Sequence, residues 1–130
     1  MKRLINTFAV CFSILLLSSC GDSPDKLMDD QVSWIKEMTD TLNEVADGKI
    51  SSSKAAQKIK TLGKQGEKFV ERKTALNKST SPDQLMEVAK EHSKETGQAF
   101  RGYMEAVSKL SASGRMTREL ADAVENMKTP

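Results

Sequence analysis

Residues 81–92 read SPDQLMEVAKEH, and this stretch carries the signals that start a helix. The Ser81 hydroxyl can accept a hydrogen bond from the first helical amides, and Pro82 suits the first helical position because no amide hydrogen is needed there. The Gln84 side chain can reach back to the Ser81 amide, which makes the start a capping box. Apolar residues then follow at spacings of three and four. The stretch therefore predicts the first turns of an amphipathic helix.

The same signals for the start and end of a helix occur twice along the chain. The letters SPD stand at residues 23–25 and again at 81–83. Each is followed by a helical pattern that reaches a glycine, a base, an apolar residue and a hydroxyl residue, as GKIS at 48–51 and GRMT at 114–117. A glycine can adopt the left-handed conformation that ends a helix, and the hydroxyl residue can cap the next one. Each copy therefore predicts a helix, a tight turn and a second helix.

These signals divide the chain into two helical hairpins, at about 24–78 and about 82–128. No stretch alternates with the two-residue period of a half-buried strand. The residues predicted to face the core are Met28, Ile35, Met38, Leu42, Val45, Ala55, Ile59, Leu62, Gly66, Phe69, Leu76, Leu85, Val88, His92, Thr96, Ala99, Tyr103, Ala106, Leu110, Leu120, Ala123, Val124 and Met127. Beside them on the third helix runs a second stripe, Met86, Ala89, Phe100, Met104 and Val107. We also expect the aromatic residues to anchor the core, at Trp34, Phe69, Phe100 and Tyr103.

The predicted fold class is all-α, a small antiparallel helical bundle of two αα-hairpins with three long helices and one short. The fourth helix would cover less than half the length of the others, which leaves part of the bundle open at one end as a groove. Charge favours pairing within the first hairpin, because residues 22–47 carry a net charge of −6 and residues 48–78 carry +7. Exposed ion pairs between two such helices each add only a few tenths of a kcal/mol.

The first twenty residues have the layout of a secretory signal. Lys2 and Arg3 form a basic start, and a largely apolar run covers residues 4–17. The letters LSSC at 17–20 resemble the lipobox of bacterial lipoproteins, an apolar residue and two small residues before a cysteine. That resemblance implies diacylation of the Cys20 sulfur and cleavage before Cys20. The alternative is an ordinary secretory signal that happens to contain a cysteine.

The resemblance to lipoproteins sets the expected organisation and location. We expect a cleaved signal peptide at residues 1–19, a lipidated tether at 20–24 and the helical bundle at 25–130. Acyl chains on Cys20 would anchor the exported protein stably in a membrane. In such lipoproteins an aspartate directly after the cysteine retains the protein at the inner membrane, and here that residue is Gly21. In a host with two membranes, we therefore expect the periplasmic face of the outer membrane.

Processing also changes which functions the composition allows. Of the 20 basic residues two leave with the signal, so 18 remain against 18 acidic ones, and nucleic acid is a poor candidate partner. Cys11 leaves with the signal and Cys20 carries lipid, so no thiol remains for a disulfide, a metal or catalysis. His92 is the one histidine and falls short of the usual zinc constellations. We therefore predict no cofactor, no metal site and no enzymatic activity.

Several residues remain as candidates for interaction. Basic residues of the second helix could touch anionic head groups near the membrane, although a solvated face explains them too; we select Lys58, Lys60, Lys64 and Lys68. His92 is the fifth candidate, as a partly buried polar residue. Four glycines lie inside the second and third helices, where each costs stability relative to alanine, and they indicate a close crossing of these two helices, a local bend, or a site of close approach by a partner: Gly63, Gly66, Gly97 and Gly102.

The leading functional hypothesis is a membrane-anchored, non-enzymatic helical lipoprotein that binds another component of the cell envelope. A second hypothesis is a structural envelope protein whose long helices associate with copies of themselves. A third is an enzyme that depends on His92, although no nucleophile elbow or phosphate-binding glycine loop accompanies it.

Overall fold

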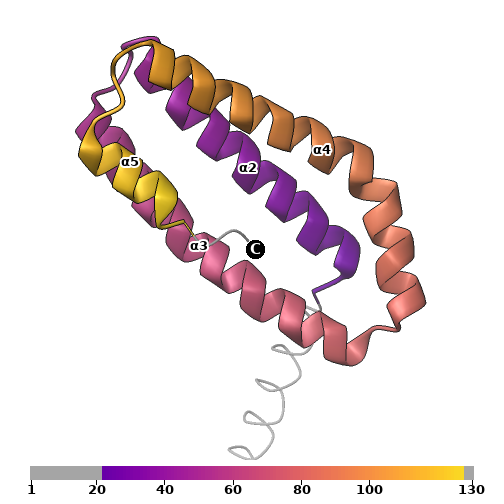
Figure 1. Ribbon diagram of the computed structural model, residues 1–130. Coiled ribbons are helices and arrows are strands. Elements are labelled where there is room, and N and C mark those ends of the chain that lie inside the picture. The colour runs from indigo at the N-terminus through magenta and orange to yellow at the C-terminus, as the bar shows by residue number, and fades with distance from the viewer. Residues whose placement is uncertain (1–21, 128–130) are drawn as a thin grey trace, which may run out of the picture.

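The computed structural model describes residues 22–127, and within that range every regular element is a helix. The helices are α2 (Pro24–Ala46), α3 (Ser52–Ser79), α4 (Pro82–Ala112) and α5 (Arg118–Glu125) (Figure 1). Three are long and the last is short, which confirms the predicted all-α bundle. The predicted signal peptide and lipidated Cys20 lie outside the described residues.

The helix boundaries are the ones that the sequence signals predict. The hydroxyl of each N-cap accepts a hydrogen bond from an amide three residues later, at Ser23, Ser51, Ser81 and Thr117. The capping box at the start of α4 is complete. Gly48 and Gly114 have φ angles of 74° and 69° and follow the ends of α2 and α4. Local sequence chemistry therefore determines where each helix begins and ends.

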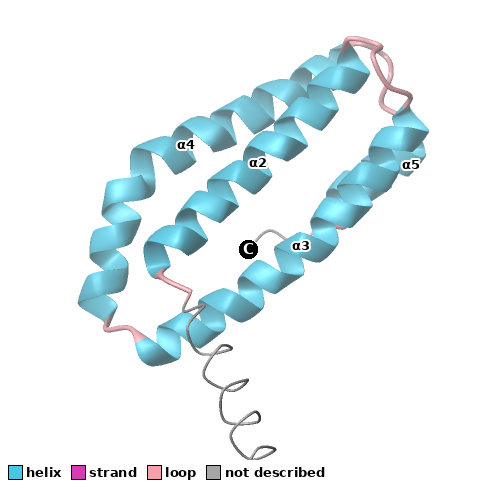
Figure 2. Cartoon of the chain, turned by 180° about the vertical axis from the view of Figure 1, so that it is seen from behind, coloured by secondary structure: helices cyan, strands magenta, loops and turns pink. Residues whose placement is uncertain are grey.

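The helices are arranged around α2, which packs against both α3 and α4 (Figure 2). Consecutive helices run in opposite directions, so α2 and α4 are parallel to each other. The short α5 packs along α3 and leaves most of α4 uncovered. The chain thus reverses between α4 and α5 as the second predicted hairpin requires. The two helices of that hairpin do not pack mainly against each other, however, because α4 packs on α2 and α5 packs on α3.

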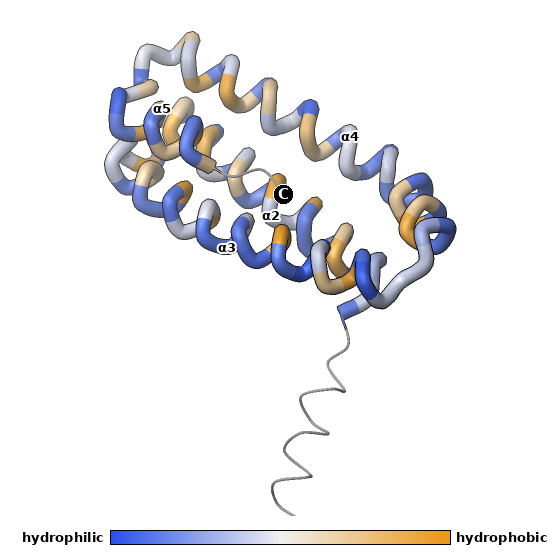
Figure 3. The backbone as a smooth tube through the Cα atoms, turned by 60° about the horizontal axis from the view of Figure 1, so that its bottom comes forward, coloured by the Kyte–Doolittle hydropathy of each residue, from blue (hydrophilic) through white to orange (hydrophobic). Residues whose placement is uncertain are grey.

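Most predicted core positions along α2 and α3, in the second half of α4 and in α5 are buried. Those that are only partly buried are Met28, Leu85, Val88, His92, Thr96, Tyr103, Val124 and Met127. Hydrophobic positions recur between hydrophilic ones along all four helices (Figure 3). The predicted residues that are buried are Ile35, Met38, Leu42, Val45, Ala55, Ile59, Leu62, Gly66, Phe69, Leu76, Ala99, Ala106, Leu110, Leu120 and Ala123. Trp34 is 4% exposed, and its ring meets that of Phe69 edge-on at a centroid distance of 5.9 Å. These two aromatic residues anchor the core as predicted.

The second stripe of α4 is an exception. Phe100 is 51% exposed, Met104 52% and Met86 67%, so the prediction that Phe100 anchors the core is wrong. The reason is that α4 packs mainly against one helix, α2, which covers one side of it. The short α5 lies against α3 and does not reach the apolar side chains beside that contact.

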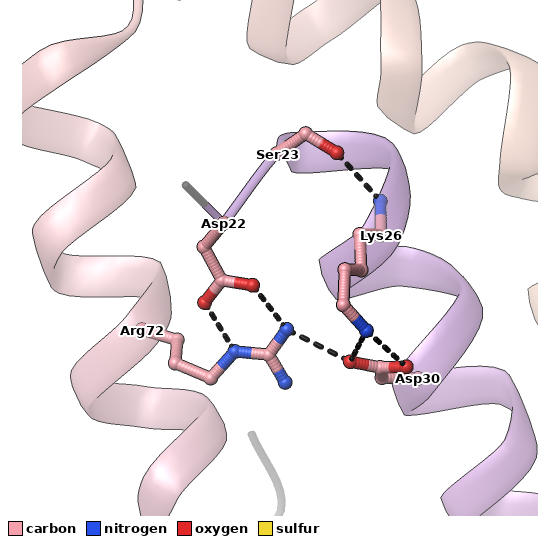
Figure 4. A network of polar contacts seen from close by, with 5 residues as sticks. All are labelled: Asp22, Ser23, Lys26, Asp30 and Arg72. Carbon is pink, nitrogen blue, oxygen red and sulfur yellow. Dashed lines mark hydrogen bonds and ion pairs between the residues drawn. The ribbon is translucent and has the colours of Figure 1, made fainter. Parts of the chain in front are cut away.

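Charged residues join α2 to α3 at the start of the described chain. The Arg72 guanidinium donates to the carboxylate of Asp22 and, over 2.8 Å, to Asp30 Oδ2 (Figure 4). The hydrogen bond from Arg72 lowers the pKa of the Asp22 carboxyl below its ordinary value. Hydrogen bonds from Lys26 and then Arg72 lower the pKa of Asp30. This network holds the first described residue against α3, two residues after Cys20 in the sequence.

Candidate functional site

An apolar groove runs beside α2 where α5 leaves α4 uncovered. Its main hollow has a volume of about 480 Å³. Residues of α2 form one side, α4 forms another, and the end of α5 closes it. The lining residues are Met28, Gln31, Trp34, Ile35, Met38, Ala89, Ser93, Thr96, Gly97, Phe100, Tyr103, Val124 and Met127.

The groove continues toward the start of α2. A second hollow of about 460 Å³ lies between that end of α2, the end of α3 and the start of α4. The two hollows share four lining residues, Met28, Gln31, Ala89 and Thr96. Together they follow α2 from Pro24 to Met38, which is about 21 Å at 1.5 Å per residue. A helix of about four turns has this length.

The short fourth helix explains why the groove is open. α5 has 8 residues and is about 12 Å long, whereas α3 has 28 residues and is about 42 Å long. α5 therefore spans less than half the length of α3 within the described residues. The opening predicted from the sequence is therefore present in the structure.

Gly97 lies in the wall of this groove, inside α4. A Cβ atom added to it would meet no atom within 4 Å among the described residues, whereas at Gly102 it would lie 3.9 Å from Thr39 and at Gly63 3.7 Å from Met127. A glycine inside a helix costs about 1 kcal/mol relative to alanine. Among the described residues α3 packs mainly against α2 and α5, so a close crossing of α3 with α4, as the glycines suggested, is not present there. At Gly97 the helix therefore leaves open space beside its backbone.

Three polar groups border this apolar surface. The Thr96 hydroxyl is buried and, within the described part of the chain, has no hydrogen-bond partner. Burial raises the pKa of the Tyr103 hydroxyl, and the Tyr103 ring lies 6.3 Å from that of Phe100. Trp34 donates its indole N–H to the Leu62 carbonyl over 2.8 Å, which leaves its ring against the groove. The site thus combines aromatic surface with few polar contacts, as binding pockets commonly do.

Three basic side chains of α4 stand beside the groove and form no ion pair within the described residues. Lys90, Lys94 and Arg101 stand seven, three and four residues from Gly97, so they lie on the same side of α4. All three are exposed, and none forms an ion pair in the described residues. Lys73 of α3 is also exposed and lines the second hollow. The α4 edge of the groove therefore carries bases that no described acid pairs with, and the exposed Glu105 stands four residues after Arg101 on the same helix.

The four lysines selected from the sequence lie elsewhere. Lys58 pairs with Glu44 of α2 at 3.3 Å, and Lys60 pairs with Glu119 of α5 at 3.6 Å. Lys64 and Lys68 are exposed on α3. None of the four lines either hollow of the groove. The structure does not bring them together with His92, which lies on α4 against α2.

His92 is partly buried, as predicted, with 16% of its side chain exposed. Its Nε2 lies 3.4 Å from Asp25 Oδ1, and its Nδ1 lies 3.5 Å from Asp29 Oδ1. Both carboxylates belong to α2. Sequence spacing did not predict that Asp25 and Asp29 lie beside His92, or that apolar residues of α4 line a groove, because the pairing of helices decides which side chains meet. The second apolar stripe of α4 was the one signal in the sequence that pointed to the groove.

Within residues 22–127, none of the helices combines the length and apolarity that crossing a membrane requires. Comparison with protein-family models, curated proteins and solved structures found no significant match to the chain.

Proposed function

We propose that this protein is a membrane-anchored lipoprotein whose helical domain, without enzymatic activity, binds an acidic amphipathic helix of another cell-envelope protein in the groove along α2. The lipid anchor at Cys20 rests on the LSSC letters of residues 17–20. In a host with two membranes, the anchor would place the domain on the periplasmic face of the outer membrane.

The observation that carries the binding proposal is the open space at Gly97, in the wall of an apolar groove. A glycine at this point lets another backbone approach α4 closely. Phe100 and Met104 stand exposed beside it, and aromatic and methionine side chains are enriched at protein interfaces. An amphipathic helix that buries its apolar face in such a groove is a recurring mode of peptide recognition.

Length and charge specify the partner further. A groove of about 21 Å takes about 14 residues of helix, with anchors at spacings of three, four and seven. Lys90, Lys94 and Arg101 along the edge favour carboxylates on the flank of the bound helix. Such charges at the rim of an interface contribute mainly to the rate of association and to the choice of partner.

Photo-crosslinking in native membranes tests this proposal. A benzophenone amino acid replaces Phe100 in the groove, and in a matched control it replaces Val70, which is 43% exposed on α3 outside the groove. We expect residue 100, and not residue 70, to capture one envelope protein through an acidic amphipathic segment identified by mass spectrometry. The substitution Gly97→Leu should remove the adduct, because its side chain fills the groove.

Other outcomes would contradict the proposal. Capture of a second copy of this chain from residue 100 would support self-association, and capture of lipid would assign the groove to an acyl chain. Equal capture from residues 70 and 100 would show no specific site. The anchor is tested separately: metabolic labelling with a fatty acid should be lost in Cys20→Ser, and retained labelling would exclude Cys20 as the acylated residue.

A further inference from the structure

The one histidine of the chain is held between carboxylates of a neighbouring helix. His92 projects from α4, and its two ring nitrogens lie 3.4 and 3.5 Å from oxygens of Asp25 and Asp29 on α2. Asp25 and Asp29 are four residues apart and so share a face of α2. Glu95 stands three residues after His92, on the same side of α4. Nitrogen and oxygen donors from two helices therefore lie within 4.8 Å of one another where α2 packs against α4.

The spacing of these donors suits a metal ion. Among the described residues, one ligand atom from each of Asp29, His92 and Glu95 lies within 4.8 Å of the other two. Ligands about 2.0–2.1 Å from a tetrahedral zinc ion are about 3.3 Å apart. The 3.5 Å between His92 Nδ1 and Asp29 Oδ1 is already close to this value. The Glu95 side chain is 52% exposed and can rotate the remaining distance.

We propose that His92 Nδ1, Asp29 and Glu95 bind a divalent transition-metal ion of the Zn²⁺ type, with water completing its coordination. One imidazole and two carboxylates form a donor set that zinc accepts, and three protein ligands leave a position for solvent. Asp25 would accept the Nε2–H of the same ring. Such a carboxylate fixes the tautomer and orientation of a histidine that ligates a metal.

A neighbouring lysine competes with the metal for Glu95. Lys36 Nζ lies 3.0 Å from Glu95 Oε1, and both side chains are more than half exposed. Ion pairs of this exposed kind contribute little, so displacing Lys36 should weaken metal binding by no more than about fivefold. The competition gives the proposal a distinctive prediction, because removal of this lysine should tighten metal binding.

The bound ion would connect α2 and α4, the two helices that form the two sides of the groove. Ser93 and Thr96 follow His92 on α4 and line that groove. An ion that binds only the folded state stabilises it in proportion to the logarithm of its concentration above Kd. The inference stands on donors outside the groove lining, so it does not depend on the proposed partner helix.

Nuclear magnetic resonance of the imidazole tests the site directly, since the full sequence has a single histidine. The full-length chain carries Cys11→Ser and Cys20→Ser so that no thiolate binds zinc, has no histidine tag, and is purified in detergent. Addition of Zn²⁺ should shift the ¹⁵Nδ1 signal of His92 and leave Nε2 protonated. Addition of Mg²⁺, which prefers oxygen ligands, is the matched control and should not shift that signal.

Calorimetry with Zn²⁺ on four variants completes the test. His92→Ala should lose binding, and Glu95→Gln, a change on the surface that leaves the core intact, should weaken it at least tenfold. Asp25→Asn should weaken binding by about 10- to 100-fold through the orientation of the ring. Lys36→Gln should tighten it, up to about fivefold. Imidazole signals unaffected by Zn²⁺, or equal affinity in the wild type and Glu95→Gln, would overturn the assignment.

Discussion

Replacing Gly97 with alanine tests whether the groove is open space or a helix contact. The new Cβ would meet no atom within 4 Å, so the substitution should add no clash and little packing. What remains is the helix propensity of alanine, which exceeds that of glycine by about 0.8–1.0 kcal/mol inside a helix. We therefore expect Gly97→Ala to raise the free energy of unfolding by about 1 kcal/mol, and Tm by about 4–5 °C for a domain of this size.

The assay is urea unfolding of the domain, without signal peptide or lipid, followed by circular dichroism. Gly48→Ala is the matched control, because Gly48 has a φ of 74° and its added Cβ would lie 2.9 Å from the Arg115 guanidinium. That variant should lose about 1–2 kcal/mol, the cost of a left-handed conformation for a residue with a side chain. A loss of stability in Gly97→Ala would refute the reasoning, since it would mean that α4 needs the glycine for packing.

Three further predictions concern the groove and the network beside it. Thr96→Val should stabilise the domain by about 1 kcal/mol in thermal unfolding, because it removes a buried hydroxyl without a partner; destabilisation would mean that the hydroxyl is satisfied. Trp34→Phe should lose about 1–3 kcal/mol in urea unfolding, because the hydrogen bond to the Leu62 carbonyl and part of a buried ring disappear; an unchanged midpoint would contradict this contact. The pKa of Asp22 is lowered in the folded state by its hydrogen bond from Arg72, so its contribution to stability is present above the unfolded value near 3.8 and is lost as pH falls through the lower folded pKa. Arg72→Met should flatten this acid dependence in unfolding measured between pH 7 and pH 3, and an unaltered slope would exclude the pair as its source.

The fold could be predicted because its signals are local. A serine or threonine cap and a glycine with positive φ act through atoms within a few residues, so Ser81 and Gly114 mark their helix ends in the sequence as they do in the structure. The core of α3 could also be predicted, since one apolar stripe from Ala55 to Leu76 faces the rest of the bundle.

The candidate site was harder to predict from the sequence, because it depends on which helices pack against each other. Phe100 has the spacing of a core residue, yet it is exposed because α5 lies on α3 and not on α4. His92 looks insufficient for a metal when only its own helix is considered. Asp29 joins it from α2, 63 positions earlier in the chain, and only tertiary packing reveals the pair. The basic residues chosen on α3 were prominent by charge alone, which does not indicate a groove.

The most direct measurement for the central claim is a titration of the domain with the partner segment captured from residue 100, made as a synthetic peptide. Trp34 is the one tryptophan of the sequence and lines the groove, so its fluorescence reports occupancy, provided that the peptide contains no tryptophan. We predict a saturable change at a ratio of one to one, which is lost in Gly97→Leu and retained in Lys68→Gln. No change in Trp34 fluorescence, or the same affinity in Gly97→Leu, would contradict binding in this groove.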